Sequence, residues 1–141
     1  MRTVAIERRS CGQGDFHWDD PESSGFIDSE CADLNLFNAR IGDDGAKALA
    51  LAILNTEAEL QSINLRDNRI SDDGAVSLAA ALANNEHVRS LQLRGNDISD
   101  RGAIALAGAL HTNTVLTDIY LTCKILEVCL SLCSSHFTGM L

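Results

Sequence analysis

The sequence predicts an α/β fold in which strand–helix units stack side by side into a short, right-handed solenoid. Two observations support this prediction. The stretches LRDNRISDDGA (65–75) and LRGNDISDRGA (93–103) begin 28 residues apart and share the pattern L-R-x-N-x-I-S-D-x-G-A. Each stretch also passes from the two-residue periodicity of a strand to the periodicity of an amphipathic helix. A repeat of about 20–50 residues is typical of solenoids, whose units bury their apolar faces only against one another.

The same frame recurs over residues 31–122, which we expect to hold about three and a half units. In the clearest unit it consists of Leu60, Ile63, Leu65, Asn68, Ile70, Gly74, Leu78 and Leu82. The equivalent residues 28 positions later are Val88, Leu91, Leu93, Asn96, Ile98, Gly102, Leu106 and Leu110. A unit 29 positions earlier contains Leu36, Ile41, Gly45 and Leu49, and a fourth begins with Leu116, Ile119 and Leu121.

Each unit begins with a short strand and a turn. In LQSINLRD (60–67), apolar and polar residues alternate, so Ile63 and Leu65 should face the core. The turn that follows carries Asn68, and Asn96 holds the same place one unit later. An asparagine amide offers two donors and an acceptor, so it can satisfy backbone groups that stacked turns bury. We therefore expect Asn68 and Asn96 to form a structural ladder of buried amides.

A helix completes the unit. Its first residues, Ser71, Asp72 and Asp73, are suited to cap free N–H groups and to meet the positive end of the helix dipole. An inward stripe of small and large apolar side chains should follow, and it consists of Ala75, Leu78, Ala79 and Leu82. The recurring glycine at 45, 74 and 102 indicates a close backbone approach or an unusual φ.

The pattern LxxLxLxxNxIxxxGxxxLxxxL resembles the leucine-rich repeats of the ribonuclease-inhibitor type, and the 28/29 alternation is similar to that class. The resemblance implies parallel strands on a concave face and helices on a convex face. It also implies a binding module similar to ribonuclease inhibitor, the Ran GTPase activators, the tropomodulins or the sensor ends of NOD-like receptors. The shared fold does not choose among them.

Both ends depart from the pattern. Residues 1–30 contain seven acids and three bases, and we expect an acidic, poorly ordered N-terminal arm. The alternative is an acidic-aromatic segment around Phe16 and Trp18 that docks on a basic partner. Residues 123–141 form an apolar tail without the repeat pattern. Two interpretations stay open for this tail: an atypical cap, or the scar of a truncated array.

The outward positions of the strands predict which side chains line the concave face. They form three columns: Asp33, Ser62, Ser90 and Asp118; Asn35, Asn64, Gln92 and Tyr120; and Phe37, Arg66, Arg94 and Thr122. Arg66 and Arg94, with Phe37 and Tyr120 beside them, are the best candidate for a partner-binding hot spot, and Asn64 and Gln92 complete that surface. The alternative is that both arginines only keep the surface soluble, paired with Asp67 or Asp97.

Other kinds of chemistry find little support. The net charge of -9 argues against a nucleic-acid binder. The spacing of Cys123, Cys129, Cys133 and His136 fits no familiar zinc pattern, so we expect no metal and no cofactor. No catalytic motif is recognisable, so we expect no enzyme activity, and a small-molecule ligand is not expected. No stretch is long enough to cross a membrane.

The five cysteines, an odd number without a CxxC pair, predict reduced thiols and a cytoplasmic chain. The predicted function is non-catalytic binding of a protein partner with an acidic patch through the concave face. The alternatives are a regulator of a small GTPase, similar to the Ran activators, and a fragment of a longer NOD-like sensor.

Overall fold

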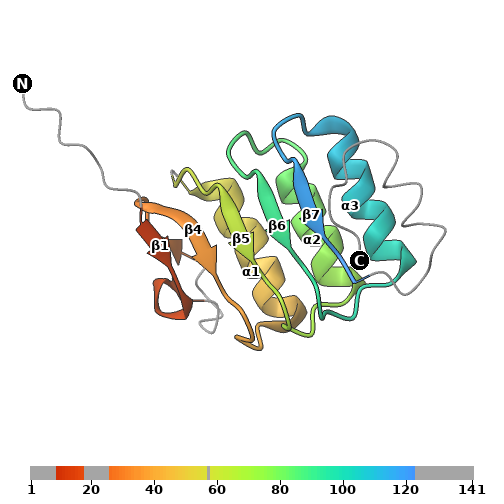
Figure 1. Ribbon diagram of the computed structural model, residues 1–141, viewed down its shortest axis with the longest axis horizontal. Coiled ribbons are helices and arrows are strands. Elements are labelled where there is room, and N and C mark those ends of the chain that lie inside the picture. The colour runs from red at the N-terminus through yellow and green to blue at the C-terminus, as the bar shows by residue number, and fades with distance from the viewer. Residues whose placement is uncertain (1–8, 18–25, 57, 123–141) are drawn as a thin grey trace, which may run out of the picture.

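The protein is a two-layer stack of strand–helix units, seen in a computed structural model that describes residues 9–17, 26–56 and 58–122. Five parallel strands form one sheet in the order β1 (Arg9–Cys11), β4 (Cys31–Asn35), β5 (Ser62–Asn64), β6 (Ser90–Gln92) and β7 (Asp118–Tyr120). Three helices cover one face of this sheet: α1 (Gly42–Asn55), α2 (Asp72–Leu82) and α3 (Asp100–Thr112). We call the opposite, exposed face of the sheet the strand face; it faces the viewer in Figure 1.

The strand register confirms the predicted alternation. Along the sheet, Leu34 pairs with Ile63, Ile63 with Leu91, and Leu91 with Ile119. All four side chains are buried under the helices. The next inward position is also buried, and it holds Leu36, Leu65, Leu93 and Leu121. The apolar frame therefore forms one continuous core along the stack, because each unit adds its leucines to the layer before it.

Alanines and glycines set the spacing between neighbouring helices. A Cβ added at Gly74 would lie 2.6 Å from an Asp43 oxygen and 2.9 Å from the Ala46 Cβ. Gly102 lies similarly close to Asp72 and Ala75. The predicted close approach is thus confirmed at these two glycines, and any larger residue there would push adjacent helices apart.

The predicted asparagine ladder is present. The Asn68 side chain is buried, and its amide nitrogen donates to the carbonyl oxygens of Leu36 at 2.7 Å and Arg66 at 3.3 Å. Its oxygen accepts from the Ile41 N–H at 3.4 Å. Each amide therefore satisfies backbone groups in its own turn and in the turn before it.

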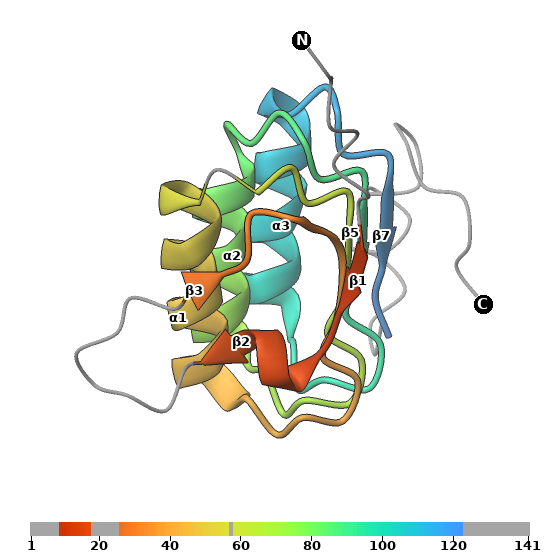
Figure 2. The same ribbon diagram turned by 90° about the vertical axis from the view of Figure 1, so that its left-hand side faces the viewer.

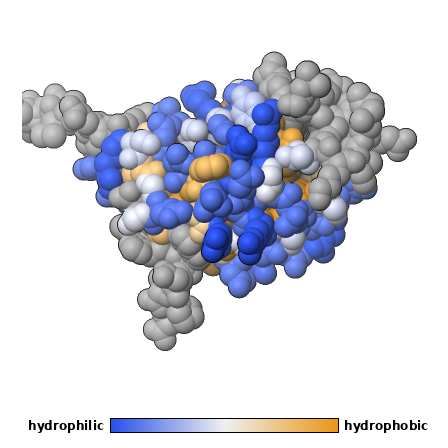
Figure 3. All heavy atoms as spheres, turned by 60° about the horizontal axis from the view of Figure 1, so that its bottom comes forward, coloured by the Kyte–Doolittle hydropathy of each residue, from blue (hydrophilic) through white to orange (hydrophobic). Residues whose placement is uncertain are grey.

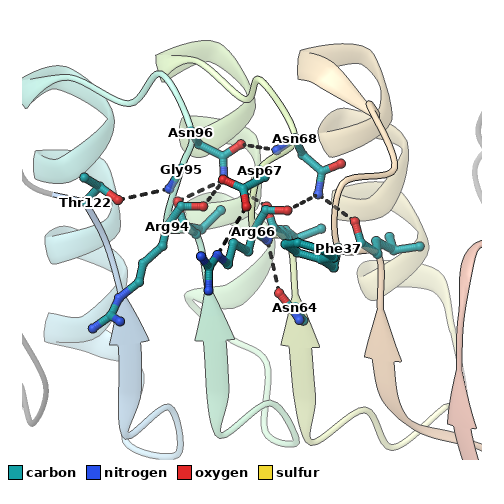
Figure 4. Close-up of polar contacts among 12 residues, drawn as sticks. Phe37, Asn64, Arg66, Asp67, Asn68, Arg94, Gly95, Asn96 and Thr122 are labelled. Atoms are coloured by element: carbon teal, nitrogen blue, oxygen red, sulfur yellow. Dashed lines mark hydrogen bonds and ion pairs between the residues drawn. The ribbon is translucent and has the colours of Figure 1, made fainter.

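One unit later, Asn96 repeats this arrangement (Figure 4). Its oxygen accepts from the N–H groups of Asn68 at 3.1 Å and Ile70 at 2.9 Å. Its nitrogen donates to the carbonyl oxygens of Leu65 at 2.8 Å and Leu93 at 2.9 Å. The two side chains thus connect three successive turns through buried hydrogen bonds.

Helix capping follows a different route from the one predicted. Ser71 begins α2, but its side chain caps no N–H of its own helix. The Asp43 carboxylate of the preceding unit instead accepts from the Ser71 N–H at 2.8 Å, the Gly74 N–H at 3.0 Å and the Ser71 hydroxyl at 2.5 Å. The start of α2 is therefore capped by the previous repeat, a relation between units that local capping rules do not contain.

Asp72 repeats this cap one unit later. Its carboxylate accepts from the Ser99 N–H at 2.8 Å, the Gly102 N–H at 3.0 Å and the Ser99 hydroxyl at 2.6 Å. The Ser99 hydroxyl bond is the largest influence that lowers the pKa of Asp72. Burial raises the pKa of Asp43, but its hydrogen bonds from Ser71 and Gly74 outweigh burial, so that pKa is also below its ordinary value.

The described part of residues 1–30 packs against the first repeat, which differs from the expected poorly ordered arm. β1 pairs in parallel with β4, and a short antiparallel pair, β2 (Phe16–His17) and β3 (Phe26–Ile27), follows a 3₁₀ turn at Gln13–Asp15. Figure 2 shows β2 and β3 in front of the helix layer, at α1. Phe16 and Ile27 are buried there, because the first repeat exposes an apolar end that needs cover. Phe16 is thus not available for the alternative docking segment, whose Trp18 lies outside the described residues.

Cys11 and Cys31 form a disulfide between β1 and β4, so the expectation of reduced thiols is wrong for this pair. Their 20-residue separation matches no spacing rule, and only the pairing of the two strands brings them together. Disulfides persist mainly in oxidising compartments, so the cysteine argument for a cytoplasmic location no longer holds and that location stays a prediction. Residues 123–141, with Cys123, Cys129, Cys133 and His136, lie outside the described residues. In the ranges that are described, no helix is both long and apolar enough to span a bilayer.

Replacing Leu65 or Leu93 with alanine should lower the free energy of unfolding by about 2–5 kcal/mol, because both side chains are buried in the shared core. Urea denaturation followed by circular dichroism measures this change. Ile104→Ala is the matched control, since that side chain is 61% exposed and its loss should have little effect. Equal stability of the Leu65 variant and the parent would contradict the inward register.

Asn68→Ala and Asn96→Ala should each lower the free energy of unfolding by about 1–3 kcal/mol, since each leaves buried backbone groups of the turns without hydrogen-bond partners. The exposed Asn84, just after the end of α2, provides the control substitution. Thermal melts of the three variants test the ladder, and an Asn68 variant that melts with the Asn84 variant would refute it.

Asp43→Asn and Asp72→Asn should each lower stability at neutral pH by about 1–3 kcal/mol, because the caps lose their charge. A carboxyl whose pKa is lowered by folding stabilises the fold above its unfolded pKa, and this contribution is lost as the pH falls through the folded pKa. The double variant should therefore lose less stability than the parent between neutral and acid pH. Denaturation at several pH values measures the difference, with exposed Asp44→Asn as control. An unchanged acid dependence in the double variant would rule out this role.

Candidate functional site

The strand face presents the predicted columns of outward side chains. Asp33 pairs with Ser62, Ser62 with Ser90, and Ser90 with Asp118. The second column pairs Asn35, Asn64, Gln92 and Tyr120 in the same way. The third column lies just past the strand ends, where the Asn38 N–H donates to the Arg66 carbonyl and the Asp67 N–H to the Arg94 carbonyl, both at 2.9 Å. The structure thus brings all six predicted partner-binding residues onto one surface.

Two arginine–aromatic contacts dominate the end of this surface. The Arg66 guanidinium carbon lies 5.7 Å from the centre of the Phe37 ring. The Arg94 guanidinium carbon lies 5.5 Å from the centre of the Tyr120 ring. Both distances fall in the range of cation–π contacts, which place a guanidinium over the face of an aromatic ring. Each contact restricts a long side chain to a position over a ring of the neighbouring unit.

Charge near Arg66 is partly balanced. Its Nε lies 3.2 Å from the Asp67 carboxylate, and both side chains are about half exposed. This contact agrees with the part of the alternative interpretation that pairs the arginine with Asp67. An exposed pair of this kind contributes at most about 1 kcal/mol, so a partner carboxylate can compete for the guanidinium. Arg94 instead extends toward β7 (Figure 4).

The turn backbone fixes the asparagines of the second column. The Asn35 oxygen accepts from the Phe37 N–H, and the Asn64 oxygen accepts from the Arg66 N–H, both at 3.1 Å. Because each oxygen is held by a backbone donor, the orientation of each amide is settled, and its NH₂ group points away from the turn. Figure 4 shows this for Asn64. At the last unit, Thr122 of the third column holds the turn backbone in a similar way: its hydroxyl oxygen accepts from the Gly95 N–H at 3.0 Å.

The six candidate side chains supply mainly hydrogen-bond donors, whereas Asp33 and Asp118 of the first column supply carboxylate acceptors. Guanidinium and amide NH₂ groups cannot accept hydrogen bonds, so they suit carboxylate and carbonyl oxygens. Apart from His17 in β2, the described histidines are His87 and His111, which are exposed and lie by the opposite, helix-to-strand edge. Within the described residues, no group of three or more His, Cys, Asp or Glu side chains is placed to hold a metal ion. The arrangement is suited to recognition by an extended surface.

Two exposed arginines were not predicted as site residues. Arg40 and Arg69 occupy equivalent places, 29 residues apart, on the first two strand-to-helix turns. Their φ angles of 56° and 57° lie in the left-handed region, which side-chain-bearing residues rarely adopt. Their 29-residue spacing is visible in the sequence. They were not predicted because the columns were derived from the alternation within the strands, and both arginines lie beyond the strand ends.

Comparison with known proteins supports the repeat assignment. A family described as "Leucine Rich repeat" matches residues 33–50, 60–79 and 84–107. Among solved structures, the chain is similar to that of "Leiomodin-1 Actin-Binding Site 2 (ABS2)", with a TM-score of 0.68 and 20% sequence identity over 81% of this chain and 74% of that one. At that identity the likeness concerns the fold. No curated protein matches the chain.

Proposed function

We propose that the chain, whose repeats match the leucine-rich-repeat family and fold as a short solenoid, is a non-catalytic protein-interaction module. The partner binds the strand face, which corresponds to the concave face of longer arrays. The binding residues in this proposal are Phe37, Asn64, Arg66, Gln92, Arg94 and Tyr120. We assign the repeats to the ribonuclease-inhibitor type as part of the same proposal, on the basis of their 28/29 period and turn asparagine.

The observation that carries the proposal is the pair of arginine–aromatic stacks on neighbouring units. Arginine and tyrosine are enriched among residues that dominate binding energy, and both offer wide contact area. Phe37 is 49% exposed although it is large and apolar, so a partner that covers it gains hydrophobic burial as well as charge pairing. The partner in this proposal contributes carboxylates, which guanidinium groups can bind in a bidentate manner.

The fold supports this kind of function. Repeat arrays hold their strand-borne side chains in fixed register over several units, which makes an extended binding surface. The similar leiomodin structure is that of an actin-binding site, so this architecture serves protein binding in that protein. Regulation of a small GTPase stays a prediction that rests on resemblance alone, since no contact among the described residues favours it.

The double variant Arg66→Glu/Arg94→Glu should fold as the parent does, because both side chains lie on the strand face rather than in the core. Its affinity for a partner captured by crosslinking should fall by about 2 kcal/mol or more, as for hot-spot residues. Titration calorimetry measures the affinity, and circular dichroism checks the fold.

Arg89→Glu provides the matched control. Arg89 is an exposed arginine that precedes β6 at the opposite edge of the sheet, so its replacement makes the same kind of charge change away from the proposed surface. Equal loss of affinity in the control and the double variant would indicate a general charge effect. Unchanged binding by a folded double variant would place the working surface elsewhere.

A further inference from the structure

The strand-to-helix turns carry positive charge in a chain that is otherwise acidic. We call residues 37–41, 66–70 and 94–98 the turn rim; it lies along the bottom edge of Figure 1. These residues hold four arginines and two aspartates, a net of +2, against -9 for the whole chain. The arginines are Arg40, Arg66, Arg69 and Arg94. Figure 3, with this edge brought forward, shows a largely hydrophilic surface broken by small hydrophobic areas.

Arg40 and Arg69 have no internal role that accounts for their charge. Both are exposed, and in the described part of the chain neither forms an ion pair, whereas Arg9, Arg66 and Arg101 each pair with an aspartate. Both also adopt left-handed φ angles, although the equivalent Asp97 of the third turn does not. Asparagine or glycine is the easier residue in that conformation. The fold alone therefore gives no reason for an arginine at either place.

The turns that carry these arginines are held side by side. The Gly42 N–H donates to the Asn68 carbonyl at 3.0 Å, and the Asn38 N–H donates to the Arg66 carbonyl at 2.9 Å. Arg40 and Arg69 thus lie on adjacent, rigid turns that continue from the Arg66 end of the strand face. On that face the Asn35 and Asn64 amides present NH₂ donors, because their oxygens are already engaged by the turn backbone.

We propose that the turn rim of the first two repeats binds an acidic peptide segment of the partner. Arg40 and Arg69 pair with its carboxylates, and the Asn35 and Asn64 amides donate to its backbone carbonyls. This inference rests on the proposed function, since the segment continues from the strand face. A peptide suits the surface better than a nucleic acid, because only a peptide combines carboxylates for the arginines with backbone carbonyls for the Asn35 and Asn64 amides.

The test measures binding of a short, fluorescein-labelled poly-glutamate peptide to the full chain by anisotropy. Arg40→Gln/Arg69→Gln should weaken this binding by about threefold to tenfold, as expected for two exposed charge pairs, and should reduce its dependence on salt. Arg89→Gln, a substitution of the same kind at the opposite edge, should leave binding unchanged. Asn64→Asp, which replaces an amide donor by a carboxylate, should also weaken binding.

The outcomes separate this inference from the proposed function. Loss of binding in Arg66→Glu/Arg94→Glu with none in Arg40→Gln/Arg69→Gln would overturn the rim proposal and leave the strand-face proposal standing. Loss of binding in Arg40→Gln/Arg69→Gln with none in Arg66→Glu/Arg94→Glu would support the rim proposal. It would also show that Arg66 and Arg94 do not belong to the binding surface of the proposed function. Inorganic polyphosphate that binds as well as poly-glutamate and depends equally on Arg40 and Arg69 would overturn the peptide assignment in favour of a general anion site.

Discussion

A backbone that turns at the same place in every unit must bury the N–H and C=O groups of those turns, and this constraint governs the whole molecule. Buried backbone groups without partners are costly, and the turns are too irregular to satisfy one another as strands do. Asn68 and Asn96 solve the problem, since each amide reaches its own turn and the turn before it. With the turns fixed in this way, the strands stay in register, and the outward side chains of successive units fall into straight columns.

The candidate surface is a direct product of that register. Phe37, Arg66 and Arg94 stand at the strand ends, and the hydrogen bonds between turns fix the distance between them. The asparagines of the second column reinforce the arrangement, because Asn64 holds the N–H of Arg66 at the residue where the chain leaves the strand. Residues of the proposed binding surface are therefore attached directly to the hydrogen-bonded turns of the stack.

Much of this architecture could be predicted from the sequence because it depends on periodicity. Leu65 and Leu93, the three columns and the two ladder asparagines all follow from positions that recur at 28 or 29 residues. The packing of β1, β2 and β3 against the first repeat could not be predicted in that way. Phe16, Cys11 and Cys31 do not recur in the other units, and their positions depend on the pairing of β1 with β4. The direction of capping was also missed. Asp43 recurs in register with Asp72, but local rules assign an acid at a helix start to its own helix rather than to the next one.

The asparagine ladder and the aspartate caps run in opposite directions along the chain, and this matters when the protein is synthesised. Asp43 precedes the helix that it caps, so a chain that leaves the ribosome N-terminus first already carries the cap when α2 emerges. Asn96 follows the turn that it completes, so the turn around Asn68 is finished only after another unit has been made. Each newly made repeat can therefore complete the hydrogen bonds of its turn only after the next repeat has been made. If translation stops between two units, the last helix already has its aspartate cap, but the turn before that helix lacks the asparagine of the next unit.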